Sequence, residues 1–278
     1  MSNMNRLSIE ERVLVIKALV EGNSLRATAR MTGVARMTVE KLLRDISAAC
    51  IAYQEKHLRN VKCKRIQCDE IWSFVYAKQK NVPVDKQDEF GYGDVWTWVA
   101  IDADSKLAVS WLVGDRSAKS AFALMDDLAS RLSHRIQSTT DGHRAYLDAV
   151  ESAFGAGVDY SMLVKLYGAG RDSEATYSPA EYHSCRAVPI IGNPDPRHIS
   201  TSFVERQNLT MMMSMRRFTR LTNAFSKKVE NHKQSIALHF MYYNFARIHQ
   251  TLRVTPAMAA GVSDEAWDVA DIVALLPN

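Results

Sequence analysis

The amino-acid sequence predicts an α/β fold in which a mixed sheet flanked by helices follows a small all-α unit. The first 61 residues carry helical patterns with capping signals, and β-type alternation begins only near Arg65. Three strand-like segments are followed by an amphipathic helix, a fourth strand and then further helices. With 278 residues, of which 47% are hydrophobic and 24% charged, the composition is that of a globular protein with one or two domains.

Residues 1–48 predict a helix-turn-helix domain that binds DNA. Ser8-Ile-Glu-Glu11 is a capping box that opens a first helix, and Ser24 caps a second. A tight turn at Gly33 leads into a third helix, which in such units enters the major groove. A three-helix bundle that binds protein is the alternative. The DNA contacts that we expect are Arg36 and Lys41 on the third helix and Arg26 on the second.

The charge of the chain is unevenly distributed. Residues 1–65 carry 13 Lys or Arg and six acids, whereas the remaining 213 residues carry 22 Lys or Arg and 25 acids. A basic N-terminal region indicates a polyanionic partner, although a solvated helical face can have the same composition.

Membrane and secretion signals are not visible in the sequence. No apolar run reaches membrane length, and the polar N-terminus does not resemble a signal peptide. The cysteines form no C-x-x-C pair, so we expect reduced thiols in a cytoplasm. A zinc site is not expected, because its candidate ligands Cys63, Cys68, His183 and Cys185 lack the spacing of common zinc modules.

Acids in the predicted strands are difficult to explain by structure alone. Residues 65–76 alternate in polarity, which places Asp69 and Glu70 on opposite faces of one strand. Asp is disfavoured within strands and a buried charge needs a partner, so a functional site and a cross-strand salt bridge are the alternatives. Asp141 ends a later strand, at the edge where α/β proteins bind ligands, although Asp-Gly also forms simple turns.

The other elements of this region follow in order along the chain. The first three strands are expected to form an antiparallel meander, and the fourth, after a helix, to run parallel to the first. Residues 168–198 are expected to be irregular. The predicted segments are strands at 95–101, 106–113 and 135–140, helices at 117–132 and 143–154, an apolar segment at 160–166 and a last helix at 226–245.

Residues 200–220 are predicted to form one helix with an acid in its first turn. Ser202-Phe-Val-Glu205 fits a capping box, which would give Glu205 a purely structural role. The segment that follows is basic, with seven Lys or Arg and one acid in residues 206–233. An acid at the start of a basic helix is also typical of a metal ligand beside a phosphate backbone. On an unbroken helix, the residues near one DNA-binding stripe are Arg206, Arg217 and Arg220.

Together, this order of strands and helices is that of an RNase H-like fold. In that fold the first and fourth strands pair, so Asp69 and Asp141 become neighbours and Glu205 reaches them from a helix packed on the sheet. Three carboxylates from separate elements can hold hard divalent ions such as Mg²⁺ or Mn²⁺. Two ions about 3.5–4 Å apart support in-line displacement at phosphorus. We therefore predict a metal-dependent phosphoryl-transfer site formed by Asp69, Asp141 and Glu205.

Several motifs carry a more specific resemblance. They are Cys68-Asp-Glu-Ile-Trp-Ser-Phe-Val75, Gly114-Asp-Arg-Ser117, Thr140-Asp-Gly-His143, Ser200-Thr-Ser-Phe-Val-Glu205-Arg-Gln-Asn-Leu, the run from Arg216 to Lys228, and Tyr243-Asn-Phe-Ala-Arg-Ile-His249. With these motifs the chain resembles DDE transposases of the insertion-sequence-one family, which are related to retroviral integrases. The resemblance implies Asp69, Asp141 and Glu205 as the acidic triad, a divalent metal, double-stranded transposon-end and target DNA as substrates, and a homodimer or larger assembly. Possible accessory residues are Glu70, His143, Arg144 and Asn208.

The resemblance covers nearly all of residues 62–258 and leaves other functions open. Founding members of the family carry a zinc-finger segment, whereas this chain has a predicted helix-turn-helix and no such cysteines. A transcriptional regulator that uses only the helix-turn-helix and an RNase H-like nuclease or decayed transposase without strand transfer are the alternatives. The predicted organisation is a helix-turn-helix domain (1–48), a linker (49–61), a catalytic domain (62–250) and a C-terminal tail (251–278).

Overall fold

A mixed six-stranded sheet forms the centre of the computed structural model, which describes residues 6–167, 182–219 and 223–277. Across the sheet the strands lie in the order β3-β2-β1-β4-β5-β6. Strand β1 is antiparallel to β2 and parallel to β4, β2 is antiparallel to β3, β4 is parallel to β5, and β5 is antiparallel to β6. The strand bounds are β1 (Arg65–Val75), β2 (Gly93–Asp102), β3 (Ala108–Gly114), β4 (Ile136–Asp141), β5 (Val158–Tyr167) and β6 (Tyr182–Ile191).

This topology is that of an RNase H-like fold, as the sequence predicts. The first three strands form the expected antiparallel meander, and β4 returns parallel to β1 after a helix. The α/β class and the RNase H-like core are therefore confirmed by strand order and direction.

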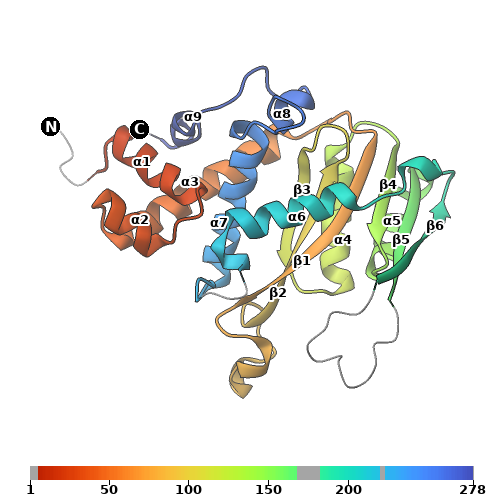
Figure 1. Cartoon of the computed structure of the whole chain (residues 1–278), viewed down its shortest axis with the longest axis horizontal. Helices are drawn as coiled ribbons and strands as arrows, with labels where there is room; N and C mark the ends of the chain where they lie inside the picture. Colours follow the sequence, from red (N-terminus) through yellow and green to blue (C-terminus); the bar gives the residue numbers. More distant parts are fainter. Residues whose placement is uncertain (1–5, 168–181, 220–222, 278) are drawn as a thin grey trace.

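Helices cover both faces of the sheet (Figure 1). On one face α4 and α5 pack against a core that includes Cys68 of β1 and Trp98 of β2. On the other face α6 and α7 pack against a second core that includes Ile71 and Val75 of β1. The helix bounds are α1 (Ile9–Val20), α2 (Leu25–Thr32), α3 (Arg36–His57), α4 (Ala118–Arg131), α5 (Ala145–Phe154), α6 (Ser202–Ser214), α7 (Val229–Met241), α8 (Pro256–Ala259) and α9 (Val269–Ala274).

The N-terminal helices α1, α2 and α3 begin close to the residues that the sequence predicts. Ser8 and Ser24 cap α1 and α2 through their side chains, and Glu11 completes the capping box of α1. Gly33 ends α2 in the left-handed conformation (φ 73°), which glycine adopts without steric cost. The short turn then leads directly into α3.

Residues 49–61, expected to be a polar helical tail or linker, are mostly helical in the structure. Helix α3 continues to His57, so most of residues 49–61 belong to a helix whose buried face includes Cys50 and Gln54. This face packs against α7, and α9 packs against α1 (Figure 1). Tertiary burial thus extends the helix beyond its predicted end and packs it against α7, one of the helices that cover the sheet.

Two further segments differ from the predictions. Residues 182–191, predicted to be irregular, form the edge strand β6, while residues 168–181 lie outside the described part of the chain. The predicted helix 200–220 ends at Ser214, because Met215 has an extended backbone (φ −128°, ψ 109°). A 3₁₀ turn, Arg216–Phe218, follows in a new direction.

Within the described residues, no helix combines the length and apolar character needed to cross a bilayer.

Candidate active site

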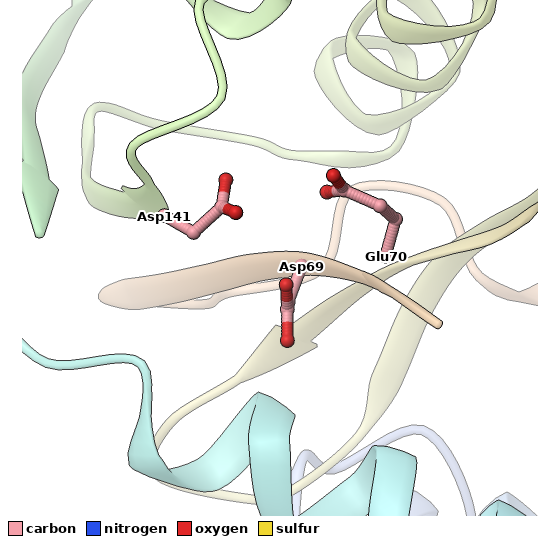
Figure 2. Close-up of side chains that lie close together, drawn as sticks. All are labelled: Asp69, Glu70 and Asp141. Atoms are coloured by element: carbon pink, nitrogen blue, oxygen red, sulfur yellow. The ribbon is translucent and has the colours of Figure 1, made fainter. Parts of the chain in front are cut away.

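The pairing of β1 with β4 brings two of the predicted acids together. The parallel register ends with Cys68 opposite Thr140, so the next residues, Asp69 and Asp141, occupy neighbouring positions. Glu70 completes an acidic cluster, which we define as Asp69, Glu70 and Asp141 (Figure 2). One carboxylate oxygen from each of these residues lies within 4.8 Å of the other two.

The two neighbouring acids of β1 project from different faces, as the alternating pattern predicts. Figure 2 shows the carboxylate of Asp69 on the side of β1 that faces α6, and that of Glu70 on the opposite side. Asp69 accepts a hydrogen bond from Asn208 Nδ2 of α6 at 2.9 Å. Glu70 is buried and accepts from Arg116 Nε at 2.9 Å and from the Tyr146 hydroxyl at 3.3 Å. Glu70 thus has a cationic partner, and Asp69 has a neutral one.

Burial and mutual repulsion make the cluster costly to ionise. Desolvation, followed by the charges of Asp141 and Glu70, raises the pKa of Asp69 to about 7. Desolvation and Asp141 likewise raise the pKa of Glu70 to about 7, although Arg116 opposes that shift. The raised pKa values of Asp69 and Glu70 indicate that these two acids have too little compensating positive charge nearby.

The donor set fits a hard divalent cation. Mg²⁺ binds oxygen ligands at about 2.0–2.1 Å, which draws them to within about 4.2 Å of one another, so the acids of the cluster need to approach only slightly. Asn208 offers a further oxygen, because its Oδ1 is buried and has no hydrogen-bond partner among the described residues. A buried polar atom without a partner is unusual and is well explained by a ligand or water that binds there. Asp69, Asp141, Glu70 and Asn208 therefore present oxygens suited to Mg²⁺ or Mn²⁺.

Glu205, the third predicted acid, lies in the first turn of α6 but outside the acidic cluster. Its Oε1 accepts a hydrogen bond from the Thr201 hydroxyl at 2.7 Å and forms an ion pair with Lys165 Nζ of β5 at 2.7 Å. The predicted Ser202 capping box is wrong, because Ser202 is already the first helical residue. The helix N-terminus is held instead by Gln67 Oε1 of β1, which accepts from the backbone N–H groups of Phe203 and Val204 at 2.8 and 3.2 Å.

The predicted accessory residues next to Asp141 have different surroundings. The backbone N–H of His143 donates to Asp141 Oδ1 at 3.0 Å, which orients that carboxylate. The His143 ring lies beside Trp98, and burial together with the charge of Arg116 lowers its pKa. Arg144 is exposed at the start of α5.

The residues predicted to bind DNA are only partly available at the surface. Arg26, Arg36 and Lys41 are exposed on α2 and α3, where Arg36 pairs with Glu40 and Lys41 with Asp45.

On α6, Arg206 is exposed. The predicted stripe is nevertheless wrong, because the chain turns at Met215 and Arg217 Nη1 donates inward to Ser226 Oγ at 2.5 Å. Burial lowers the pKa of the Arg217 guanidinium to about 10. Arg220 lies outside the described residues.

Three residues of the site were missed by sequence reasoning. Gln67 shares the face of Asp69 two positions earlier, so the alternation of the strand could have indicated its direction. Arg116 lies in the Gly-Asp-Arg-Ser motif that follows β3, and its guanidinium also stacks over Trp96 at 4.5 Å. No feature of the sequence around Lys165 indicates its contact with Glu205, because only the tertiary structure brings β5 close to α6.

Comparisons with known proteins add little at the level of sequence. No protein-family model matches the chain, and no curated protein sequence matches it. Among solved structures, the Mos1 transposase paired-end complex with the left transposon end is similar at 15% identity and a TM-score of 0.23. That match covers 56% of this chain and 58% of the other, so the chain spans little more than half of that protein. The Mos1 strand transfer complex is similar at 12% identity and a TM-score of 0.25, over 84% of this chain and 76% of the other. Because both TM-scores are low, the fold is assigned from strand order and direction.

Proposed function

We propose that this protein is a DNA transposase, similar to DDE enzymes of the insertion-sequence-one family. It would bind the ends of its element, hydrolyse a phosphodiester there and join the freed 3′-hydroxyl to target DNA. The observation that carries the proposal is the acidic cluster where β1 lies beside the end of β4 in an RNase H-like sheet. The proposal does not rest on the similarity to the solved Mos1 transposase complexes, because their TM-scores are low.

Asp69 and Asp141 are the proposed principal metal ligands. Asp69 is oriented by Asn208, and Asp141 by the backbone N–H of His143, so neither carboxylate depends on a mobile partner. Divalent ions bound here would activate the attacking oxygen and stabilise the leaving oxygen of an in-line displacement at phosphorus. Because the pKa of Asp69 is raised to about 7, metal binding at this carboxylate would compete with protonation.

The remaining acids have proposed roles that follow from their surroundings. Glu205 lies one helical turn before Asn208 on α6 and is the proposed third acid, which joins the cluster when its ion pair with Lys165 opens. Glu70 is a proposed accessory residue that adds negative charge from the opposite face, where Arg116 and Tyr146 hold it.

DNA is the proposed polyanionic substrate. The N-terminal helices expose Arg26, Arg36 and Lys41, and α6 exposes Arg206, the residue that follows Glu205. Backbone contacts by such residues release counterions and supply affinity without reading sequence. A homodimer or larger assembly is proposed because two element ends must be joined to one target.

The experiment uses duplexes that carry the DNA ends flanking the gene of this protein. We expect cleavage at the ends with Mg²⁺ or Mn²⁺, strand transfer to a second duplex, and loss of both in Asp69→Asn and Asp141→Asn. Binding of the ends without cleavage under every metal condition would instead support a helix-turn-helix regulator, which needs no acidic cluster. Cleavage without joining would support an RNase H-like nuclease.

A further inference from the structure

The Glu205 carboxylate is held by two donors at the same oxygen. Lys165 Nζ lies 2.7 Å from Oε1, and the Thr201 hydroxyl donates to Oε1 at 2.7 Å. Both side chains of the ion pair are only partly exposed, at 33% for Lys165 and 40% for Glu205. An ammonium therefore lies at the carboxylate that the triad requires as a metal ligand.

The position of Lys165 follows from the sheet register. Strand β5 pairs with β4 so that Leu163 lies opposite Asp141, the last residue of β4. Lys165 is two residues further along β5 and, by strand alternation, projects from the same face as Leu163. The strand thus extends beyond Asp141 and carries a lysine toward α6 from a rigid backbone position.

Lys165 also acts on the acidic cluster itself. Its charge opposes the rise in the pKa of Asp69, so the ammonium lies within electrostatic reach of Asp69 as well as Glu205. The positive charge of Lys165 supplies part of the compensation that a divalent ion would provide. The ammonium and a divalent ion would repel each other strongly across a few ångströms of partly desolvated protein.

We propose that Lys165 is an internal counter-cation that a divalent ion must displace from Glu205, and that a DNA phosphate then takes up the displaced ammonium. Lysine is a flexible point charge with three donors and is well suited to exchange a carboxylate for a phosphate. Glu205 joins the cluster only when its ammonium has another anion to bind. Assembly of the full triad is thereby coupled to the presence of DNA. This inference rests on the proposed function, because it assigns Glu205 to the metal site.

The test measures Mn²⁺ affinity of the full chain by calorimetry without DNA, so catalysis is not needed as a readout. We expect Lys165→Met to bind Mn²⁺ about fivefold more tightly than the parent, the ratio that corresponds to about 1 kcal/mol for loss of a partly exposed ion pair. Lys165→Arg, which retains the charge, should behave like the parent. Lys56→Met, which removes an exposed lysine at the far end of α3, is the matched control and should change nothing.

Two further measurements make the assignment specific. In a Glu205→Gln background the effect of Lys165→Met should become clearly smaller, because only the direct repulsion between the ammonium and the ion remains and a double-mutant cycle isolates the coupling between the two residues. A short mixed-sequence duplex should strengthen Mn²⁺ binding by the parent more than by Lys165→Met. Urea unfolding of each variant verifies that it is folded.

The outcomes separate this inference from the proposed function. Equal Mn²⁺ affinity of the parent and Lys165→Met, or an effect of undiminished size in Glu205→Gln, overturns the inference alone. A parent protein that binds no Mn²⁺ in either the presence or the absence of DNA overturns the proposed metal site and the inference together.

Discussion

Asp69 and Glu70 are consecutive in the sequence, yet their carboxylates lie on opposite faces of β1 and have partners of different charge. Asp69 faces α6 and accepts from the neutral amide of Asn208, whereas Glu70 faces α5 and is bound by the Arg116 guanidinium. Neutralising each acid should therefore have different consequences, which distinguishes the proposed metal ligand from its accessory neighbour.

The first prediction compares the two acids in catalysis. Asp69→Asn should abolish cleavage of end DNA, because an amide is a much poorer metal ligand than a carboxylate, and end binding should remain because the N-terminal helices are unchanged. Glu70→Gln should retain measurable cleavage, since its carboxylate already has Arg116 as a partner. Gel assays of cleavage and of binding in Ca²⁺ would check both statements. Full activity in Asp69→Asn with none in Glu70→Gln would show that the roles are reversed.

The second prediction concerns stability against pH. Folding raises the pKa values of Asp69 and Glu70 from ordinary values of 3.8 and 4.5 to about 7, so the folded protein holds protons that the unfolded chain has lost. The contribution of these groups to the free energy of unfolding should consequently be greatest below about pH 4 and fall as pH rises to about 7. In chelator, urea unfolding should show lower stability at pH 8 than at pH 6, and Mn²⁺ should restore it at pH 8.

The matched control for this pH dependence is Asp69→Asn. It removes one of the two titrating groups, so the fall in stability between pH 6 and pH 8 should become smaller in chelator. The same variant should lose part of the stabilisation by Mn²⁺. A pH dependence identical to that of the parent would contradict the assignment of Asp69 as a buried acid of raised pKa.

The third prediction concerns the partner of Glu70. Arg116→Met should destabilise the protein at pH 8 by about 1–3 kcal/mol, because it leaves a buried carboxylate without its cationic donor. The loss should be smaller at pH 5, where Glu70 is protonated. Combining Arg116→Met with Glu70→Gln should recover most of the stability in urea unfolding. A loss that is independent of pH and not recovered would indicate that Arg116 acts by packing over Trp96 instead.

The fourth prediction concerns the N-terminal helices. Arg36→Ala or Lys41→Ala in the full chain should weaken end binding by about 1–3 kcal/mol if the side chain contacts a base edge. Lys56→Ala is the control on the same helix, about 30 Å from Arg36 by helical rise. Binding titrations in Ca²⁺ would compare the three variants. Equal weakening by all of them would point to non-specific electrostatics instead of a recognition helix.

The fifth prediction separates two arginines that the sequence places on one stripe. Arg206 is exposed on α6, so Arg206→Ala should flatten the dependence of log affinity on log salt by about 0.9 for each lost phosphate contact. Arg217 donates to Ser226 inside the fold, so Arg217→Ala should lower the free energy of unfolding and leave that slope unchanged. A flatter salt dependence in Arg217→Ala, with no change in Arg206→Ala, would instead indicate that Arg217 contacts DNA.

The sequence by itself determined the elements whose signal is local. Alternation over residues 65–76 predicts both the strand β1 and the opposite directions of Asp69 and Glu70, because side chains in a strand alternate wherever the strand packs. The capping residues Ser8 and Ser24 and the left-handed Gly33 mark helix ends through hydrogen bonds a few residues away. Element order was then sufficient for the RNase H-like topology, and with it for the proximity of Asp69 and Asp141.

Tertiary structure alone decided the surroundings of the catalytic candidates and the limits of several elements. Helix α3 continues past its predicted end because α7 buries its second half, and α6 stops where Met215 turns the chain. Lys165 reaches Glu205 across 40 positions of sequence because the β4–β5 pairing carries its strand past Asp141. Periodicity records which face of an element is buried, but it carries no information about which distant element covers that face. For that reason the candidate acids could be predicted from the sequence, whereas only the fold shows that Glu205 is paired with Lys165.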